Sequence, residues 1–277
     1  GRITATGSLV YTNVTEHVKI GDAPADFQRL APSFTVSLQP WQEQLLFLRL
    51  MYKSTFRMPT FNDLYYYRLG NRSLRPEKAN EYNMGITWSR SFSSFLNYLS
   101  VTVDGYYNDV TDKIVAFPTT YAWKMANYGK VHVTGMDATL AAAASLGKNM
   151  VLVVSGGYTW QKAIDLTDAT SKSYKDQLPY TPKHSGNVSA VLEMPWVNVG
   201  YSIVGVSERY SMSQNIPENR IDGYMEHTAS LSRNFSFRHC KLRLQAEIIN
   251  MTDTQYDVIK YYPMPGRSWR LTGTIEF

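Results

Sequence analysis

The 277-residue sequence has a single cysteine, Cys240, and no long hydrophobic run. One cysteine excludes an intrachain disulfide and any metal site built from several thiolates, and we interpret it as a small, half-buried side chain. Apolar runs such as VLVV at 151–154 fall far short of the roughly 18–20 residues that a transmembrane helix needs. No helical membrane anchor is therefore predicted, although the strands of a membrane barrel would produce no such run either.

The sequence also has few charged residues, 18% of the total. The net charge is +5, and the basic residues are spread along the chain without a basic stripe, so nucleic acid is not an expected partner. The sequence begins without an initiator methionine, a basic segment or an apolar leader, and we therefore expect it to be part of a longer protein. The histidines lack the close spacing of metal ligands, so we expect wall or surface positions for them, no metal site and no bound cofactor: His17, His132, His184, His227 and His239.

Aromatic residues are abundant, with 20 Tyr, 11 Phe and 6 Trp. Apolar and polar residues alternate with a period of two from end to end, which is typical of strands with one apolar face. The segment 241–248 places Leu242, Leu244, Ala246 and Ile248 on one face and Lys241, Arg243, Gln245 and Glu247 on the other. Burying such charges in a dry core would be very costly. We therefore expect the polar face to line a wide, wet interior and the apolar face to contact lipid, with aromatic girdles at its edges drawn from Tyr82, Trp88, Trp196, Trp269 and Phe277.

About twelve segments show this pattern, each comparable to the 9–11 residues that cross a bilayer on a tilt. They are 2–12, 32–40, 44–55, 80–91, 97–111, 130–145, 149–162, 183–193, 196–207, 222–235, 240–250 and 267–277. Long connectors at 13–31, 56–79, 112–129, 163–182, 208–221 and 251–266 alternate with short ones. This rhythm is typical of outer-membrane barrels, which have short turns at one end and long loops at the other. The segment 130–145 fits least well, because its TLAAAAS stretch is also compatible with a helix.

Several motifs resemble those of TonB-dependent outer-membrane receptors. FRMPTF at 56–61 is similar to the FRxP motif of that family, and GNRSLRPE at 70–77 is similar to its N-x-x-L-x-P-E motif; the two bracket an extracellular loop there. NYGKVHVTGMDATL at 127–140 and LPYTPKHSGNVSA at 178–190 resemble two of its strand openers. The C-terminal signature is matched by Asn250, Asp253, Tyr256, Pro265, Gly266, Arg267 and the terminal Phe277. The resemblance covers most of residues 49–277 and lies in the order and spacing of these motifs.

The resemblance implies an all-β fold, an antiparallel transmembrane β-barrel. Residues 1–277 would form the C-terminal portion of one barrel domain, about 12 of about 22 strands, with the plug domain absent. It implies an outer-membrane location in a Gram-negative bacterium, contact with outer-membrane lipid, and no enzymatic activity. The function implied is active transport: binding and import of a scarce nutrient, with a ferric siderophore or cobalamin favoured. The TonB energy-transducing complex would act through the missing N-terminal part, and the barrel-assembly machinery would recognise Phe277.

Two clusters in the long connectors are candidate substrate contacts. Tyrosines give rigid, amphipathic contact area and cationic side chains add charge-assisted hydrogen bonds, which suits an iron chelate or a corrinoid. The candidates are Arg57, Tyr65, Tyr66, Tyr67, Arg68 and Arg72 in the first cluster, and Lys260, Tyr261 and Tyr262 in the second. The alternative is packing between loops and, for Arg57, a salt bridge with Glu77 or Glu81. Gly70 and Gly266 are expected at turns with positive φ.

Two other classes of protein stay open. A self-contained twelve-stranded barrel enzyme, of the phospholipase or protease type, would need a Ser/His or Asp/His constellation at its rim. His184 and Ser185 are the nearest candidates, but adjacent residues of a strand point to opposite faces. A passive porin or adhesin barrel is the third possibility. A plug domain encoded upstream would decide in favour of a receptor.

Overall fold

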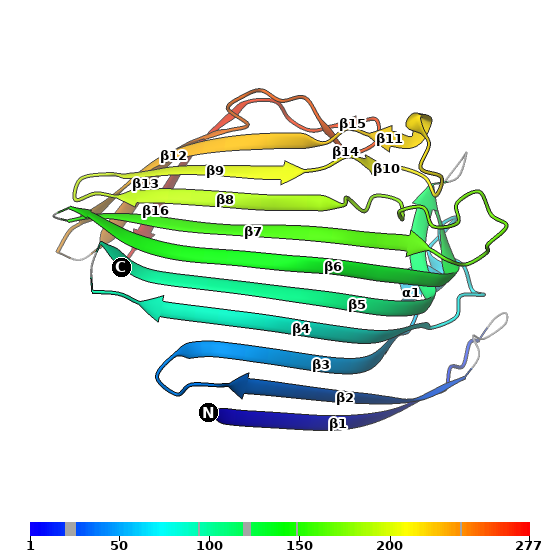
Figure 1. Cartoon of the computed structure of the whole chain (residues 1–277). Helices are drawn as coiled ribbons and strands as arrows, with labels where there is room; N and C mark the ends of the chain where they lie inside the picture. The colour runs from blue at the N-terminus through cyan, green and yellow to red at the C-terminus, as the bar shows by residue number, and fades with distance from the viewer. Residues whose placement is uncertain (20–25, 94, 119–122, 148, 239) are drawn as a thin grey trace.

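The computed structural model describes residues 1–19, 26–93, 95–118, 123–147, 149–238 and 240–277. Within these ranges, twelve strands form one curved antiparallel sheet, in which each strand pairs with its neighbour in the sequence (Figure 1). The strands are β1 (Arg2–Val14), β2 (Phe27–Gln39), β3 (Leu45–Arg57), β4 (Glu77–Ser91), β5 (Leu96–Pro118), β6 (Trp123–Gly147), β7 (Met150–Asp165), β8 (His184–Glu193), β9 (Asn198–Val206), β12 (Tyr224–Ser236), β13 (Lys241–Ile249) and β16 (Ser268–Glu276). No helix in the described part of the chain is long and apolar enough to span a membrane.

The twelve predicted strands are confirmed, including the doubtful one. Residues 130–145 lie within β6, where the alanine-rich stretch pairs with β5 on one side and β7 on the other. Two boundaries were wrong. β2 begins at Phe27 rather than near residue 32, because Pro32, opposite Leu9, interrupts the alternation without ending the strand. The connector predicted at 112–129 is mostly strand, since β5 and β6 continue as a paired hairpin to Pro118 and Trp123.

The strand register keeps the two faces of the sheet chemically distinct. On one face, Leu242 of β13 lies opposite Phe235 of β12 and Ile275 of β16. On the other face, Glu247 lies opposite Ser230 and Arg270, and Arg270 Nε is 2.6 Å from Glu247 Oε2. Large side chains of the apolar face are uncovered: on β16, Trp269 is 74% and Leu271 81% exposed. An apolar surface of this extent requires an apolar environment.

The polar face carries hydrogen-bonded ladders of ionic and hydroxyl side chains. Arg49 Nη2 lies 2.9 Å from Asp104 Oδ1, and its Nη1 donates to Thr87 Oγ1 at 2.6 Å. Thr87 is in turn 3.0 Å from Thr102 Oγ1 on β5. These groups satisfy one another while remaining partly exposed, so the face is suited to contact with water or with a polar protein surface.

The buried core is concentrated at the end of the sheet where the long connectors gather. One cluster joins the ends of β4, β5, β6 and β7 nearest the long connectors to the β7–β8 connector: Ala79, Val110, Val131, Val133, Ala163 and Leu178. A second cluster joins the β3–β4 connector to the β5–β6 hairpin: Leu64, Leu74, Ile114 and Met125. The long connectors are therefore packed structures, and the sheet positions them as one group.

Candidate ligand site on the long loops

The β3–β4 connector begins with a short helix, α1 (Phe61–Tyr65), that is tied down at its N-terminus. Thr60 and Asp63 form a capping box: Thr60 Oγ1 accepts from the Asp63 N–H at 3.2 Å, and Asp63 Oδ2 accepts from the Thr60 N–H at 2.9 Å. Such a box satisfies two backbone donors that a helix start leaves free. Arg57, at the end of β3, adds an ion pair, with Nη2 2.9 Å from Asp63 Oδ2.

This ion pair corrects the predicted partner of Arg57. Glu77, one of the two partners expected, accepts instead from the Ile114 N–H at 3.0 Å, with Lys113 Nζ at 3.6 Å. Burial alone would raise the pKa of the Asp63 carboxyl, but the Thr60 N–H and the Arg57 guanidinium outweigh it and hold that pKa below its ordinary value. Asp63 therefore stays ionised and keeps α1 anchored to β3.

The GNRSLRPE motif at 70–77 also holds the β3–β4 connector in place. Leu74 is 6% exposed in the cluster with Met125, and Asn71 Nδ2 donates to the Met125 carbonyl at 3.1 Å. Asn127 of β6 accepts from the Arg75 N–H at 2.9 Å and donates to the Asp112 carbonyl at 2.6 Å. The motif residues thus fasten this connector to the β5–β6 hairpin.

The aromatic and cationic residues predicted to contact substrate lie on the outside of this braced connector. Tyr66 and Tyr67 are 60% and 79% exposed. The Arg68 guanidinium lies 5.1 Å from the centre of the Tyr67 ring, and that of Arg72 lies 5.3 Å from the Tyr65 ring. Tyr65 itself is turned inward, packed against the Leu64 cluster with a buried hydroxyl.

The predicted positive φ at Gly70 and Gly266 is wrong. Neither glycine has a φ in the left-handed region, but each is closely approached. A Cβ on Gly70 would lie 2.7 Å from the Tyr66 nitrogen, and one on Gly266 would lie 2.6 Å from Asp253 Oδ1. Glycine is needed at both positions for space rather than for backbone conformation.

The β13–β16 connector is likewise built on buried polar contacts. Tyr256 stacks on Tyr224 of β12, with ring centres 3.9 Å apart, and its hydroxyl donates to Glu226 Oε2 at 2.5 Å. Burial and the adjacent Glu226 carboxylate raise the pKa of the Tyr256 phenol. The Tyr256 phenol therefore stays protonated, and its hydrogen bond to Glu226 holds the connector against β12.

At the tip of this connector, β14 (Asp257–Ile259) and β15 (Tyr262–Pro263) form a small hairpin. Tyr261 and Tyr262 are 82% and 70% exposed. Lys260 is half-buried, and its Nζ donates to the Glu218 carbonyl of the β9–β12 connector. Two of the three predicted residues thus present free side chains, while the third links two connectors.

A pocket that sequence reasoning missed lies among the connectors. It has a volume of about 510 Å³ and is lined by Trp123, Tyr180, Arg209, Tyr224 and Ile259, among others. Arg209, from β10 (Arg209–Tyr210), is 4% exposed. Its Nη2 donates to the Asp257 and Val258 carbonyls at 2.6 and 3.0 Å, and its guanidinium lies 5.8 Å from the centre of the Tyr224 ring.

The other terminal nitrogen of Arg209, Nη1, is buried and has no hydrogen-bond partner within the described ranges. No carboxylate in those ranges lies within ion-pair distance of this guanidinium either. A buried cation without a counter-charge is costly, which makes Arg209 the most unusual electrostatic feature of the connectors. Nothing in the sequence distinguishes Arg209 from Arg220, which is exposed and paired with Asp222.

The structure does not join the two predicted clusters directly. Among the described residues, no hydrogen bond or ion pair links Tyr65–Arg72 to Lys260–Tyr262. They are connected through the intervening loops. Leu69 accepts from the Met125 N–H at 3.0 Å, Trp123 lies 5.9 Å from the Tyr180 ring, and the Tyr180 N–H donates to the Tyr210 carbonyl at 2.7 Å. Arg209, next to Tyr210, donates to the Asp257 and Val258 carbonyls of the second connector. The pocket around Arg209 occupies the middle of this chain of contacts.

The Ser/His arrangement of a barrel enzyme is not assembled at the rim. Ser185 pairs with Thr159 and His184 with Trp160, so the two side chains lie on opposite faces of β8. The His184 ring is engaged by the Tyr158 hydroxyl, 2.7 Å from Nδ1.

Comparison with known proteins identifies the architecture. The family model described as TonB dependent receptor-like, beta-barrel matches residues 1–251. The chain belongs to the TonB-dependent receptor β-barrel family. Its sequence is 25% identical over 230 residues to the vitamin B12 transporter BtuB of Photobacterium profundum and 26% identical over 231 residues to that of Vibrio vulnificus, in each case over 80% of this chain. It spans about a third of the length of these curated relatives, 34% and 33%.

Among solved structures, the fold is similar to that of BauA, the ferric preacinetobactin receptor of Acinetobacter baumannii. The TM-score is 0.72 at 12% identity, over 99% of this chain and 40% of BauA. At this identity the likeness shows the fold alone. Proteins of this family are transport receptors, and the predicted all-β, twelve-stranded sheet is confirmed within it.

Proposed function

We propose that residues 1–277 form the C-terminal portion of an outer-membrane, TonB-dependent receptor barrel that binds and imports a scarce nutrient, a ferric siderophore or cobalamin. The relatives are named for vitamin B12 transport and the structural neighbour for a ferric siderophore. The apolar face of the sheet contacts outer-membrane lipid, and the polar face borders the interior. The end that carries the long connectors faces outward, where it meets the ligand.

The observation that carries the ligand proposal is the buried guanidinium of Arg209 in an aromatic pocket among the long connectors. An anionic group on the ligand would supply the counter-charge that the described residues lack, through charge-assisted hydrogen bonds. Trp123, Tyr180 and Tyr224 would supply flat contact area. Tyr66, Tyr67, Arg68, Arg72, Tyr261 and Tyr262 are placed to make the first, exposed contacts, and Arg57, Tyr65 and Lys260 to position them.

The experiment is ligand binding to the intact receptor by isothermal titration calorimetry, with a panel of ferric siderophores and cyanocobalamin. For the ligand that binds, Arg209→Met should weaken affinity at least tenfold, because it removes a buried cation from a site that needs one. Arg220→Met is the matched control, since Arg220 is exposed on the adjacent β11 (Arg220–Ile221). Equal affinities for both variants would refute the assignment of the pocket.

The exposed arginines of the β3–β4 connector, Arg68 and Arg72, are tested separately by measuring ligand uptake. Arg68→Ala with Arg72→Ala should slow uptake of an anionic chelate, while Arg90→Ala, at the opposite end of β4, should not. Unchanged uptake for every anionic candidate would exclude these arginines from ligand capture.

Two further partners complete the proposal. TonB acts through the part of the receptor that precedes this sequence, and the barrel-assembly machinery reads the terminal aromatic. Phe277 is fully exposed at the end of β16 and free to be recognised. Phe277→Ala should lower the amount of receptor inserted in the outer membrane, whereas a normal amount would remove Phe277 from this role.

A further inference from the structure

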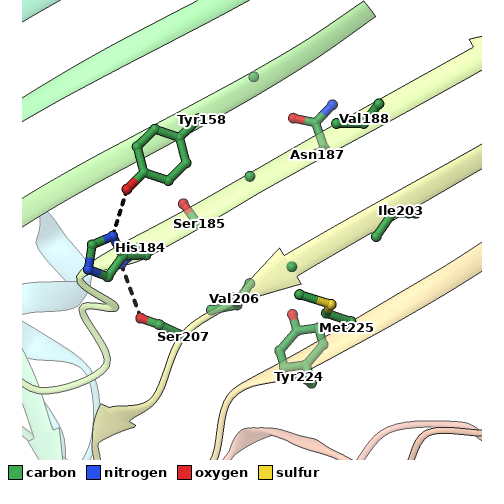
Figure 2. Close-up of a pocket in the computed structure, with 13 residues that line it drawn as sticks. Tyr158, His184, Ser185, Asn187, Val188, Ile203, Val206, Ser207, Tyr224 and Met225 are labelled. Atoms are coloured by element: carbon green, nitrogen blue, oxygen red, sulfur yellow. Dashed lines mark hydrogen bonds between the residues drawn. The ribbon is translucent and has the colours of Figure 1, made fainter.

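The apolar face of the sheet contains a second groove, which shares only Val206 and Tyr224 with the pocket around Arg209. It lies over β7, β8, β9 and β12 and has a volume of about 440 Å³ (Figure 2). Its floor is a pair of glycines, Gly186 and Gly205, that lie directly opposite each other. Tyr158 borders it on one side, and Met225 lies beside Gly205 on the other. The two paired glycines thus leave a trough between Tyr158 and Met225 in the apolar face.

The end of the groove toward the long connectors is polar. The Tyr158 hydroxyl lies 2.7 Å from His184 Nδ1, as the dashed line in Figure 2 shows. With the phenol as donor, Nδ1 accepts and the proton of the neutral ring resides on Nε2. His184 is exposed, and in the described ranges no side chain accepts a hydrogen bond from its Nε2. The ring is therefore held as an outward-facing N–H donor.

A lysine lies on the same face of the neighbouring strand. Trp160 of β7 is paired with His184, and Lys162 lies two residues further along the same face of β7. Lys162 is exposed. The apolar trough thus ends at a hydrogen-bond donor, with a lysine beyond it on the same face of the neighbouring strand. This arrangement is the complement of an amphiphile with an anionic head.

The Tyr–His contact recurs on the same face around the sheet. Tyr107 of β5 lies 3.2 Å from His132 of β6, and Tyr201 of β9 lies 2.7 Å from His227 of β12, again at Nδ1. In the first of these, the Asp109 carboxylate lies beside the ring, with Oδ1 3.2 Å from Nε2. At the groove, the register places Lys162, and not a carboxylate, next along the same face from Trp160, the partner of His184.

We propose that this groove binds one acyl chain of a membrane lipid with a phosphate headgroup, and that His184 and Lys162 bind the phosphate. The proposal rests on the membrane placement given above but is independent of the imported nutrient. The paired glycines admit the chain, and the Tyr158 hydroxyl fixes the ring that donates to the phosphate. The apolar fit and the charge complementarity are separate and can be tested separately.

The test is native mass spectrometry of the intact, delipidated receptor with dioleoylphosphatidic acid and, as the chain-matched lipid without phosphate, dioleoylglycerol. The expected result is a one-to-one complex with at least a tenfold preference for phosphatidic acid. Lys162→Ala with His184→Phe should abolish this preference. A preference that survives both substitutions, or no preference in the unsubstituted receptor, would overturn the phosphate site.

The trough is tested by Gly205→Leu. A Cβ there meets only Met225 Cγ, at 3.7 Å, so the side chain fills the groove without a backbone clash. Gly273→Leu is the matched control on the same face, where a Cβ meets only Leu244 Cδ2, at 3.6 Å. Gly205→Leu should weaken binding of phosphatidic acid about tenfold and Gly273→Leu should not; equal binding would overturn the trough. Nutrient uptake should be normal in Gly205→Leu, so uptake defects in the loop variants and lipid defects in this variant report on different proposals.

Discussion

The ion pair between Arg57 and Asp63 predicts how the β3–β4 connector responds to two substitutions. If Arg57 braces α1, then Arg57→Ala should loosen residues 60–66 in the absence of any ligand. Asp63→Ala should loosen them more, because it removes both the ion pair and the hydrogen bond that the Asp63 carboxylate accepts from the Thr60 N–H. The double substitution should then resemble Asp63→Ala alone, since Arg57 would have no remaining partner.

The magnitudes follow from exposure. The Arg57 side chain is 48% exposed, and that of Asp63 is 12% exposed, so solvent screens the pair and its loss costs at most about 1 kcal/mol. Loss of the hydrogen bond from the Thr60 N–H to the Asp63 carboxylate costs about 1 kcal/mol more. Because about 1.4 kcal/mol is a factor of ten, Arg57→Ala should raise the local opening equilibrium up to about fivefold and Asp63→Ala about thirtyfold.

Amide hydrogen exchange followed by mass spectrometry on the intact receptor measures this opening directly. The peptide covering 60–66 should exchange faster by these factors, while β13 peptides provide an internal reference that should not change. Unchanged exchange in Arg57→Ala, combined with weaker ligand binding, would refute the brace and assign Arg57 to the ligand instead.

Three further predictions concern the same connector. Leu74→Ala should cost about 2 kcal/mol or more of local stability, since it opens a cavity beside Met125. Hydrogen exchange at the β5–β6 hairpin should become faster; exchange no faster than in the parent would contradict this prediction. Gly70→Ala should cost about 1–3 kcal/mol, because its Cβ would lie 2.7 Å from the Tyr66 nitrogen; ordinary exchange there would show that the backbone can shift. Asp63 has a pKa below its ordinary value of 3.8. The stability that its ionised carboxylate gives to the connector is therefore complete above pH 3.8 and is lost as the pH falls through the lower, folded-state pKa. Hydrogen exchange at 60–66, corrected for its intrinsic pH dependence, should rise in that pH range in the parent but not in Asp63→Asn.

The strands could be predicted because their two faces are chemically distinct. A period-two alternation with leucines on one side and Lys241, Arg243 and Glu247 on the other has few structural solutions. The β6 stretch TLAAAAS carried little signal of its own, and pairing with β5 and β7 decided its structure. Where alternation was broken by a proline, as at Pro32, the boundary was misplaced.

The site was less predictable, because its contacts are set by the packing of the connectors. Tyr66, Tyr67, Tyr261 and Tyr262 are exposed, as their sequence context indicated. Which carboxylate pairs with Arg57 depended on the capping of α1, which is a local geometry that spacing does not encode. Arg209 gave no signal at all, since its burial follows from the packing of the β13–β16 connector over β10.

The central claim is that one face of this sheet contacts lipid and the other borders an aqueous interior. Nitroxide labels placed one at a time from 242 to 248 on β13, in a receptor with Cys240→Ser, test it by collision with oxygen and with a water-soluble nickel complex. The labels at 242, 244, 246 and 248 should favour oxygen, and those at 243, 245 and 247 should favour nickel. The opposite alternation, or no alternation, would contradict the claim.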